Sequence, residues 1–365
     1  MKAKYETVGF GILGAGTAAD YHREAVESNA DLRARLVAVG HHDPARFDEI
    51  GARFGVPCLT PEDLLDRSDV DVVCVCTPSG RHAGEVVAAA EAGKHVLVEK
   101  PMALSLEEAN AAIGACDRAR VELGVVFQRR AQPLFECVHE AIRAGDLGDL
   151  TLGTATIPYY RSQSYYGSAD WRGTWSLDGG GVLMNQGIHL VDLLVWYMGD
   201  PVEVRAHAGT LGREIEVEDT LTATLRFSSG AFATITATTT AQPGFPHTIE
   251  VYGTGGGIQI EGENVRRWAL ADPVGSIVKP LESEDYSGVG ARGDARGIST
   301  SGHVAVFRDF IDALRAGRRP QVDGREGMRA LATVLAVYEA AGLTKGREEE
   351  RRFATSDNST GDLHE

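Results

Sequence analysis

Short apolar segments alternate with helical patterns in the first third of the chain. The apolar segments lie at 8–13, 36–40, 70–77, 96–99 and 125–128, and helical spacing of apolar residues occurs at 18–29, 44–54, 83–92 and 106–120. Strands that are apolar on both faces are typical of a parallel sheet covered by helices on both sides. The repeated strand–helix order therefore predicts an α/β fold, with a doubly wound parallel sheet over residues 1–128.

The pattern changes after residue 129. Six segments alternate apolar and polar residues with period two, and many of the polar positions are threonine: 151–157, 202–211, 219–227, 232–239, 248–252 and 258–261. Such alternation predicts an open, mostly antiparallel sheet with one apolar and one polar face. Helices are expected at 132–144, 181–198, 303–316 and 326–342. We therefore expect an α+β domain over residues 129–345, followed by a disordered tail at 346–365, which is charged and then polar.

Composition narrows the classes of partner. The 365 residues are 43% apolar and 24% charged, with a net charge of −16, which is typical of a globular protein and disfavours nucleic acid or an anionic membrane as a partner. No apolar run is long enough for a transmembrane helix, and residues 1–7 lack the apolar core of a signal peptide. Five cysteines without such a signal predict reduced thiols and a cytoplasmic protein. No metal is expected, because no cysteine and histidine cluster has ligand spacing.

A glycine-rich turn follows the first predicted strand. Gly14, Gly16 and Ala19 fill the G-x-G-x-x-G/A dinucleotide fingerprint between a strand and a helix. The first glycine permits a tight turn, the second lets the backbone approach a pyrophosphate, and the small third residue lets helix and strand pack closely. Free N–H groups at the helix start, near Thr17 and Ala18, would bind the anion. The first domain is therefore predicted to be a Rossmann domain that binds a dinucleotide.

The residue after the second strand distinguishes the two nicotinamide cofactors. An acidic residue there binds the ribose 2′-hydroxyl of NAD and repels the 2′-phosphate of NADP. His41 occupies that position and His42 follows it, so no acid is present. We expect NADP to bind at least as well as NAD, although either cofactor fits the residues and both histidines could be plain loop residues. Asp43 and Pro44 suit the cap and first position of the next helix.

Residues 76–101 carry a distinctive set of motifs, CTPSGRHAGEVVAAAEAGKHVLVEKP. Together with the glycine turn, the stretch from Gly179 to Asp192 and the helical segment HVAVFRDFIDALRAGRRP, they resemble the Gfo/Idh/MocA oxidoreductase family of glucose–fructose oxidoreductase and inositol dehydrogenase relatives. The resemblance extends over nearly the whole chain. It implies a nicotinamide-dependent oxidoreductase acting on a carbohydrate-like substrate, and a homodimer or homotetramer formed through the outer face of the second domain's sheet.

Lys100 is the central candidate for catalysis. It follows an apolar strand, and open α/β sheets bind ligands at the carboxyl ends of their strands. A lysine there can donate a hydrogen bond to the reacting oxygen and stabilise a developing alkoxide, although a surface lysine fits the residues equally well. The resemblance favours catalysis, because the family's Glu-Lys-Pro lysine reaches cofactor and substrate, and it also implies a cis bond after Lys100. Further cofactor contacts are expected at Thr77, Pro78, His82 and Glu99.

A second group of polar residues lies in the predicted helix 181–198. Asn185, His189 and Asp192 are spaced by four and three residues and therefore share one helix face. His189 suits proton transfer near neutral pH, and Asp192 could fix its ring; a polar stripe satisfied by its own hydrogen bonds is the alternative. In the family this helix faces the nicotinamide, and many members have aspartate where this chain has Asn185. Because asparagine cannot accept a proton, the resemblance leaves acid–base catalysis to His189 with Lys100.

Aromatic residues and arginines precede this helix. The tyrosines could stack on a sugar and donate hydrogen bonds, and family members with a similar Trp-Arg pair use it near the cofactor. Packing at a domain or subunit interface is the alternative for each tyrosine. The further cofactor candidates are Trp171, Arg172 and Gln128, and the substrate candidates are Tyr160, Tyr166, Asp192 and His303.

These features predict an NAD(P)-dependent oxidoreductase that transfers a hydride between the nicotinamide and a carbinol or carbonyl carbon of a sugar, polyol or glycoside. Two alternatives remain open: a dinucleotide-binding regulatory sensor without turnover, and a reductase of a non-sugar substrate. A pure sensor need not keep both Lys100 and His189, and this chain has both.

Overall fold

The computed structural model describes residues 5–271 and 300–343, so the expected tail at 346–365 lies outside the described residues. The chain divides into two compact units. Within the described ranges, the first unit contains residues 5–140 and 300–331, and the second unit contains residues 141–271 and 332–343. Residues 300–331, which the sequence pattern grouped with the second domain, therefore belong to the first unit.

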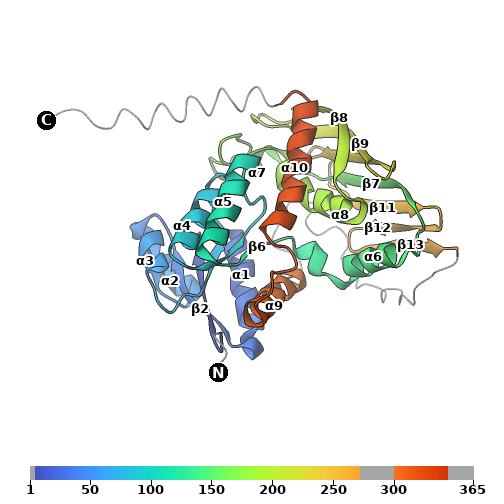
Figure 1. Ribbon diagram of the computed structural model, residues 1–365. Coiled ribbons are helices and arrows are strands. Elements are labelled where there is room, and N and C mark those ends of the chain that lie inside the picture. Colours follow the sequence, from blue (N-terminus) through green and yellow to red (C-terminus); the bar gives the residue numbers. More distant parts are fainter. Residues whose placement is uncertain (1–4, 272–299, 344–365) are drawn as a thin grey trace. The chain divides into compact units, whose positions relative to one another are not determined.

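A six-stranded parallel sheet forms the centre of the first unit (Figure 1). Its strands are β1 (Val8–Leu13), β2 (Ala34–Gly40), β3 (Cys58–Leu59), β4 (Val72–Val75), β5 (His95–Val98) and β6 (Leu123–Val125). Their order, β3-β2-β1-β4-β5-β6, and their parallel pairing confirm the predicted doubly wound sheet. Every residue of β1 and β4 is buried, as expected for strands with helices on both faces.

Helices connect the strands of this sheet. They are α1 (Thr17–Ser28), α2 (Phe47–Phe54), α3 (Pro61–Leu65), α4 (His82–Glu91) and α5 (Leu106–Ala119), and α6 (Pro133–Ala144) follows β6 in the chain. Local capping explains where several begin: Thr60 and Ser105 accept backbone hydrogen bonds at the starts of α3 and α5. Asp43 caps the 3₁₀ turn Pro44–Arg46, so the helix expected at 44–54 begins with a tighter turn before α2.

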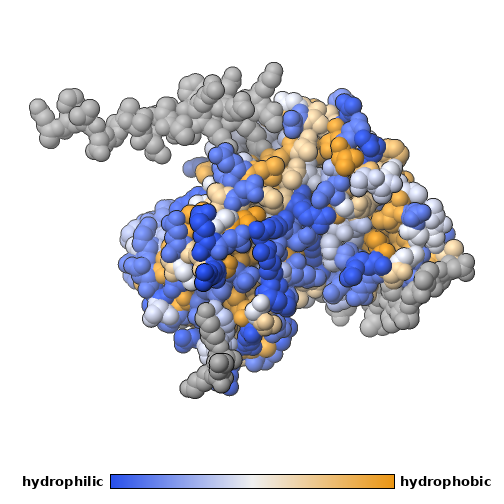
Figure 2. Space-filling model, in the orientation of Figure 1, coloured by the Kyte–Doolittle hydropathy of each residue, from blue (hydrophilic) through white to orange (hydrophobic). Residues whose placement is uncertain are grey.

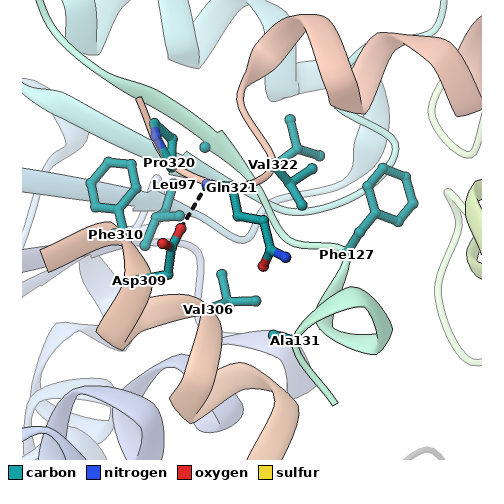
Figure 3. A pocket seen from close by; sticks show the side chains of 11 residues that line it. Leu97, Phe127, Ala131, Val306, Asp309, Phe310, Pro320, Gln321 and Val322 are labelled. Carbon is teal, nitrogen blue, oxygen red and sulfur yellow. Dashed lines mark hydrogen bonds between the residues drawn. The ribbon is translucent and has the colours of Figure 1, made fainter. Parts of the chain in front are cut away.

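Helix α9 (Ser301–Ala316) completes the core of the first unit. Phe307 and Phe310 are fully buried in the same apolar cluster as Phe10 of β1, and the rings of Phe10 and Phe307 are 5.5 Å apart. Figure 3 shows a small pocket beside α9, lined mainly by Leu97, Phe127, Val306, Phe310, Pro320 and Val322. At its edge, Asp309 accepts a hydrogen bond from the backbone of Gln321 (2.7 Å). Its apolar lining offers few polar groups to orient a substrate, so we attribute it to packing.

A seven-stranded sheet forms the centre of the second unit. Its strands are β7 (Leu150–Pro158), β8 (Pro201–Gly209), β9 (Thr220–Phe227), β10 (Phe232–Thr238), β11 (Thr248–Gly253), β12 (Gly256–Glu261) and β13 (Asn264–Leu270). Their order is β13-β12-β11-β7-β10-β9-β8, and each neighbouring pair is antiparallel except β7 with β10. The predicted open, mostly antiparallel sheet is therefore confirmed.

The two faces of this sheet differ in polarity. Helix α8 (Ile188–Met198) packs on the apolar face, where Gly153 of β7 permits close approach because a side chain there would collide with Met198 and Leu194. The polar positions that alternate with the buried ones in β9 and β10 are mainly threonines: Thr222, Thr224, Thr234 and Thr236. Two of the chain's exposed large apolar side chains, Leu152 and Phe232, are cross-strand partners on β7 and β10.

Several predicted boundaries were wrong. The strand expected at 125–128 is replaced by the earlier β6 and by a 3₁₀ turn at Gln128–Ala131. The helix expected at 181–198 begins as a π-helical turn, Val182–Gly187, before α8. The short helix α7 (Gln163–Tyr166) and the edge strand β13 were not predicted, because α7 is a single turn and β13 carries charged residues of the kind that edge strands tolerate. The last described helix is α10 (Gly324–Ala340).

The surface in view mixes hydrophilic residues with small hydrophobic patches (Figure 2). Such mixing is ordinary for a folded chain, because more than half of a protein's accessible surface is apolar. Surface hydropathy alone therefore does not locate the site, and the geometry of particular residues must do so.

Candidate active site

The turn between β1 and α1 has the geometry that a dinucleotide requires. Gly14 has a φ of 95°, which favours glycine, and a side chain there would collide with the backbone of Cys76. A side chain at Gly16 would meet nothing within 4 Å, so a ligand can approach the backbone closely. Helix α1 begins at Thr17 without a side-chain cap, which leaves N–H groups for an anion, and Ala19 is fully buried against the sheet. These residues fit the pyrophosphate of NAD or NADP.

The histidines after β2 lie beside this turn. His41 and His42 line a small pocket together with Gly14, Thr77 and Arg81. Burial lowers the pKa of His41, and its Nδ1 accepts a hydrogen bond from the backbone N–H of Asp43 (3.1 Å). The same Nδ1 lies 3.4 Å from the carbonyl oxygen of Asp43. With its pKa lowered, His41 offers this pocket one neutral ring N–H rather than a positive charge.

Two charged residues of the same pocket were missed by the sequence analysis. Arg81 forms an ion pair with Glu85 (3.1 Å), and Glu85 also accepts a hydrogen bond from the hydroxyl of Thr77 (2.6 Å). Both residues lie in the segment GRHAGE after β4, where no motif marks them. Only the folded chain brings this segment beside His41.

Lys100 follows β5 and is anchored to a buried carboxylate. The backbone N–H of Lys100 donates to Glu99 Oε2 (3.3 Å), and Glu99 Oε1 lies 2.9 Å from His22 Nε2. Burial alone would raise the pKa of Glu99, but the hydrogen bond and charge of His22 outweigh it, and the pKa falls to about 2. Because His22 belongs to α1, this ionised carboxylate links Lys100 to the helix of the glycine turn. Glu99 is 9% exposed, and its expected contact with the cofactor stays a prediction.

Two other expected contacts are buried in the first unit. His303 is 4% exposed, its Nε2 lies 3.9 Å from Glu99 Oε1, and its ring stacks on Tyr21. Burial lowers the pKa of His303 to about 4, so the imidazole is neutral at pH 7. Gln128 is 8% exposed, and its Oε1 has no hydrogen-bond partner within the described residues. His303 thus packs beside Glu99, and its expected contact with the substrate stays a prediction.

His82 joins the loops that follow β4 and β5. Its Nε2 lies 2.7 Å from the carbonyl oxygen of Thr77, and its Nδ1 lies 2.7 Å from that of Pro101. The side chain is 1% exposed, so it supports this segment from inside. The Lys100–Pro101 peptide bond is cis, as the family resemblance implied. Pro78 is half-buried at the start of the first of these loops.

The helical segment of the second unit exposes few polar side chains. Asn185 and His189 are partly exposed, whereas residues 182–184 and 190–195 are buried. A π-helical turn precedes α8, a departure that is frequent at functional sites. His189 and Asp192 lie three residues apart on α8, but Asp192 is fully buried and could reach a ligand only through other residues.

Asn185 is held by an aspartate that the sequence analysis overlooked. Its Nδ2 donates a hydrogen bond to Asp178 Oδ1 (2.7 Å), and Asp178 Oδ2 accepts from the backbone N–H of Gly173 (2.9 Å). Asp178 is 3% exposed, so this pairing takes place inside the unit. Asp178 directly precedes the glycine run at 179–181, but a lone aspartate before glycines does not reveal its partner.

The chain between β7 and this segment gathers arginine and aromatic side chains. The guanidinium of Arg172 lies 4.6 Å from the Trp171 ring and 4.4 Å from the Tyr165 ring, and it donates to the Tyr165 hydroxyl (2.6 Å). Trp171, Arg172 and Tyr160 are half-buried. Tyr166 is buried instead. Its hydroxyl donates a hydrogen bond to the hydroxyl oxygen of Thr239 (3.0 Å), and burial raises its pKa to about 12.

Other expected properties concern metals, membranes and thiols. Among residues 5–271 and 300–343, no three histidine, cysteine or acidic side chains gather in a way that could hold a metal ion. No helix in those ranges is long and apolar enough to cross a membrane. All five cysteines are free thiols, as their odd number and sequence context predicted.

Two family descriptions match most of the chain. Residues 8–127 match an oxidoreductase family with an NAD-binding Rossmann fold, and residues 135–259 match the GFO/IDH/MocA C-terminal domain. The class defined by the fold and the glycine turn is therefore an NAD-binding Rossmann oxidoreductase.

Similar proteins support the same assignment. Inositol 2-dehydrogenase of Rhizobium meliloti (strain 1021) is 30% identical over 89% of this chain and 94% of its own length. D-xylose 1-dehydrogenase (NADP(+)) 2 of Haloferax volcanii is 29% identical over 91% of this chain and 97% of its own. The WlbA dehydrogenase of Bordetella pertussis, solved with NADH and UDP-GlcNAcA, matches with a TM-score of 0.81 at 34% identity, over 92% and 96%.

The chain belongs to the Gfo/Idh/MocA oxidoreductase family. The predicted family, fold class and enzyme class are therefore confirmed.

Proposed function

We propose that this protein is an NAD(P)-dependent dehydrogenase that moves a hydride between the nicotinamide and a carbinol or carbonyl carbon of a sugar or polyol. The observation that carries the proposal is the half-buried Lys100, fixed at the carboxyl end of β5 and linked through Glu99 and His22 to the helix of the dinucleotide turn. The relatives named for inositol and xylose, and the one solved with a nucleotide-linked sugar acid, support a carbohydrate-like substrate.

Lys100, His189 and Asn185 divide the work on the substrate oxygen in this proposal. The nicotinamide supplies the hydride acceptor or donor when it is bound. Lys100 donates a hydrogen bond to the reacting oxygen and stabilises its developing negative charge. His189 takes the hydroxyl proton during oxidation and returns it during reduction. Asn185 orients a substrate hydroxyl, because its amide is itself held by Asp178.

The cofactor preference follows from the pocket beside the glycine turn. No acid stands at His41, and a ring N–H of this histidine is available to donate to a 2′-phosphate. Arg81 adds a positive charge to the same pocket, although Glu85 partly balances it. We therefore propose that NADP binds at least as tightly as NAD, with further contacts from Trp171 and Arg172.

The outer face of the second unit's sheet is the proposed subunit interface. Leu152 and Phe232, which are 40% and 58% exposed, lie side by side on this face among threonines. Exposed apolar side chains of this size favour burial against a partner. We propose a homodimer or homotetramer formed through this face, in the cytoplasm, where the five free thiols would stay reduced.

Turnover by matched lysine variants tests the proposed activity. Reduction of NADP and NAD would be followed by nicotinamide absorbance with sugars, polyols, uronic acids and nucleotide sugars. Lys100→Ala should lower turnover roughly 100-fold or more while dinucleotide binding persists. Lys94→Ala is the control, because Lys94 only donates to the backbone carbonyls of Arg67 and Val70. Near-normal turnover by Lys100→Ala would refute the assignment.

The same panel distinguishes the alternatives. Dinucleotide binding without turnover of any compound would favour a regulatory sensor. Turnover only of imines or enones would favour a reductase of a non-sugar substrate. For the cofactor, His41→Asp should weaken NADP binding and shift preference toward NAD, measured by fluorescence titration. A strong NAD preference in the unmodified protein would contradict the proposal.

A further inference from the structure

One buried glutamate, Glu218, accepts hydrogen bonds from three of the four free amide groups at the start of the helical segment of the second unit. Glu218 Oε2 accepts a hydrogen bond from the N–H of Gly181 (2.8 Å), and Oε1 accepts from Leu183 (3.0 Å). Between them, the backbone carbonyl oxygen of Glu218 accepts from the N–H of Val182 (3.0 Å). Three consecutive amides that cannot bond within a helix are therefore satisfied by one residue.

A tyrosine from α10 completes this arrangement. The hydroxyl of Tyr338 accepts a hydrogen bond from the N–H of Met184 (3.2 Å) and donates one to Glu218 Oε1 (2.8 Å). The next amide, that of Asn185, bonds within the helical segment to the carbonyl of Gly181 (3.0 Å). Glu218 and Tyr338, which we call the Glu218–Tyr338 clamp, thus take the four amides that precede the first internal hydrogen bond.

The glycine run at 179–181 fits this clamp. A side chain at Gly180 would collide with the Tyr338 hydroxyl, and one at Gly181 would collide with the backbone carbonyl of Glu218. These glycines let the two clamping residues approach the helix start directly. The glycines that begin the stretch from Gly179 to Asp192 therefore have a local steric reason.

The carboxylate of the clamp has no positively charged partner among the described residues to offset the cost of its burial. Glu218 is 1% exposed and forms no ion pair with a described residue, and burial raises its pKa to about 7. A neutral side chain would cap a helix at lower cost. An acid held by several donors instead fixes position and direction, because each carboxylate oxygen has a defined set of partners.

We propose that Glu218 and Tyr338 are positioning residues for the reaction, which hold the π-helical turn so that Asn185 and His189 meet the substrate in one fixed orientation. This inference rests on the function proposed above. Asn185 directly follows the four clamped amides, and His189 lies one turn further on. A shift of about 1 Å in such groups can cost roughly 100-fold in rate.

The test compares two tyrosine-to-phenylalanine variants. Tyr338→Phe removes one hydroxyl from the clamp and keeps the ring, which packs edge-on against Trp175. Tyr159→Phe is the matched control, because Tyr159 is also buried in the second unit and its hydroxyl bonds to His247 (2.8 Å), outside the clamp. Glu218→Gln serves as a second variant. Each protein is assayed for kcat, KM and dinucleotide Kd, and for amide hydrogen exchange over residues 181–189, well below its melting temperature.

Tyr338→Phe should lower kcat roughly 10- to 100-fold, change KM much less and leave dinucleotide Kd unchanged. Its amides at 182–184 should exchange roughly tenfold faster than in the wild type, whereas Tyr159→Phe should change neither kcat nor those amides. Equal kcat and equal exchange in both variants would overturn the clamp. If the wild type turned over no sugar, exchange alone would decide: faster exchange in Tyr338→Phe would support the clamp while the proposed function failed, and unchanged exchange would refute it.

Discussion

Replacing Glu218 with glutamine should change how the stability of the second unit depends on pH. Glu218 is buried without a positive partner, and desolvation raises its pKa from the usual 4.5 to about 7 despite hydrogen bonds from Leu183, Tyr338 and Gly181. Between those two pH values the folded chain keeps the proton that the unfolded chain has released. Stability must therefore fall as pH rises through this window.

The size of the effect follows from the same shift. A pKa raised from 4.5 to about 7 corresponds to about 3 kcal/mol of unfolding free energy, because each pKa unit is worth about 1.4 kcal/mol. The contribution is complete below the unfolded pKa and is lost as pH rises through the folded one. Glutamine does not titrate, so Glu218→Gln should lose this part of the pH dependence. Glu218→Gln should also lower the free energy of unfolding by about 1–3 kcal/mol at every pH, because the NH₂ group of the new amide faces N–H donors.

Urea unfolding at several pH values from about 5 to about 8 would measure this difference. All four tryptophans, Trp171, Trp175, Trp196 and Trp268, lie in the second unit, so their fluorescence reports its unfolding. Across this pH range, the free energy of unfolding of the wild type should fall by about 3 kcal/mol relative to that of Glu218→Gln. Glu214→Gln, which changes an exposed glutamate in the preceding loop, should follow the wild type. Parallel pH profiles for the wild type and Glu218→Gln would show that the hydrogen bonds fully offset desolvation and would refute the reasoning.

Three further changes test neighbouring parts of the structure. Gly181→Ala should destabilise the second unit by more than about 3 kcal/mol, because its methyl group would overlap the carbonyl of Glu218; a melting temperature within two or three degrees of the wild type would contradict this. His22→Ala should lower the free energy of unfolding by about 3–5 kcal/mol, measured in urea, because the ionised Glu99 stays buried without the hydrogen bond and charge of His22. His189→Ala should strongly lower the rate of substrate oxidation and flatten the rise of that rate with pH on the acidic side of the profile. An unchanged rise would show that another group accepts the proton.

The N-terminal sheet could be read from the chain because its determinants are local. Alternating apolar segments and helical patterns arise from residues within one element, and the sheet they predict is present in the order β3-β2-β1-β4-β5-β6. The glycine turn is equally local, since Gly14 needs its positive φ and Gly16 its missing side chain within a few residues of each other. The family resemblance at Glu99, Lys100 and Pro101 likewise rests on consecutive residues.

The polar contacts around the candidate site depended on the tertiary structure. His22 meets Glu99 across 77 residues of sequence, and Tyr338 meets Glu218 across 120. A histidine, glutamate or tyrosine carries no local sign of such a partner, because each side chain has several possible donors and acceptors until the fold brings one of them close. The same applies to α9, whose helical pattern was visible but whose place in the core of the first unit depends on packing against distant β1. Local periodicity therefore determined the elements and the dinucleotide turn, whereas the pairing of buried polar groups required the folded chain, because hydrogen bonds between distant residues exist only after apolar packing has brought the elements together.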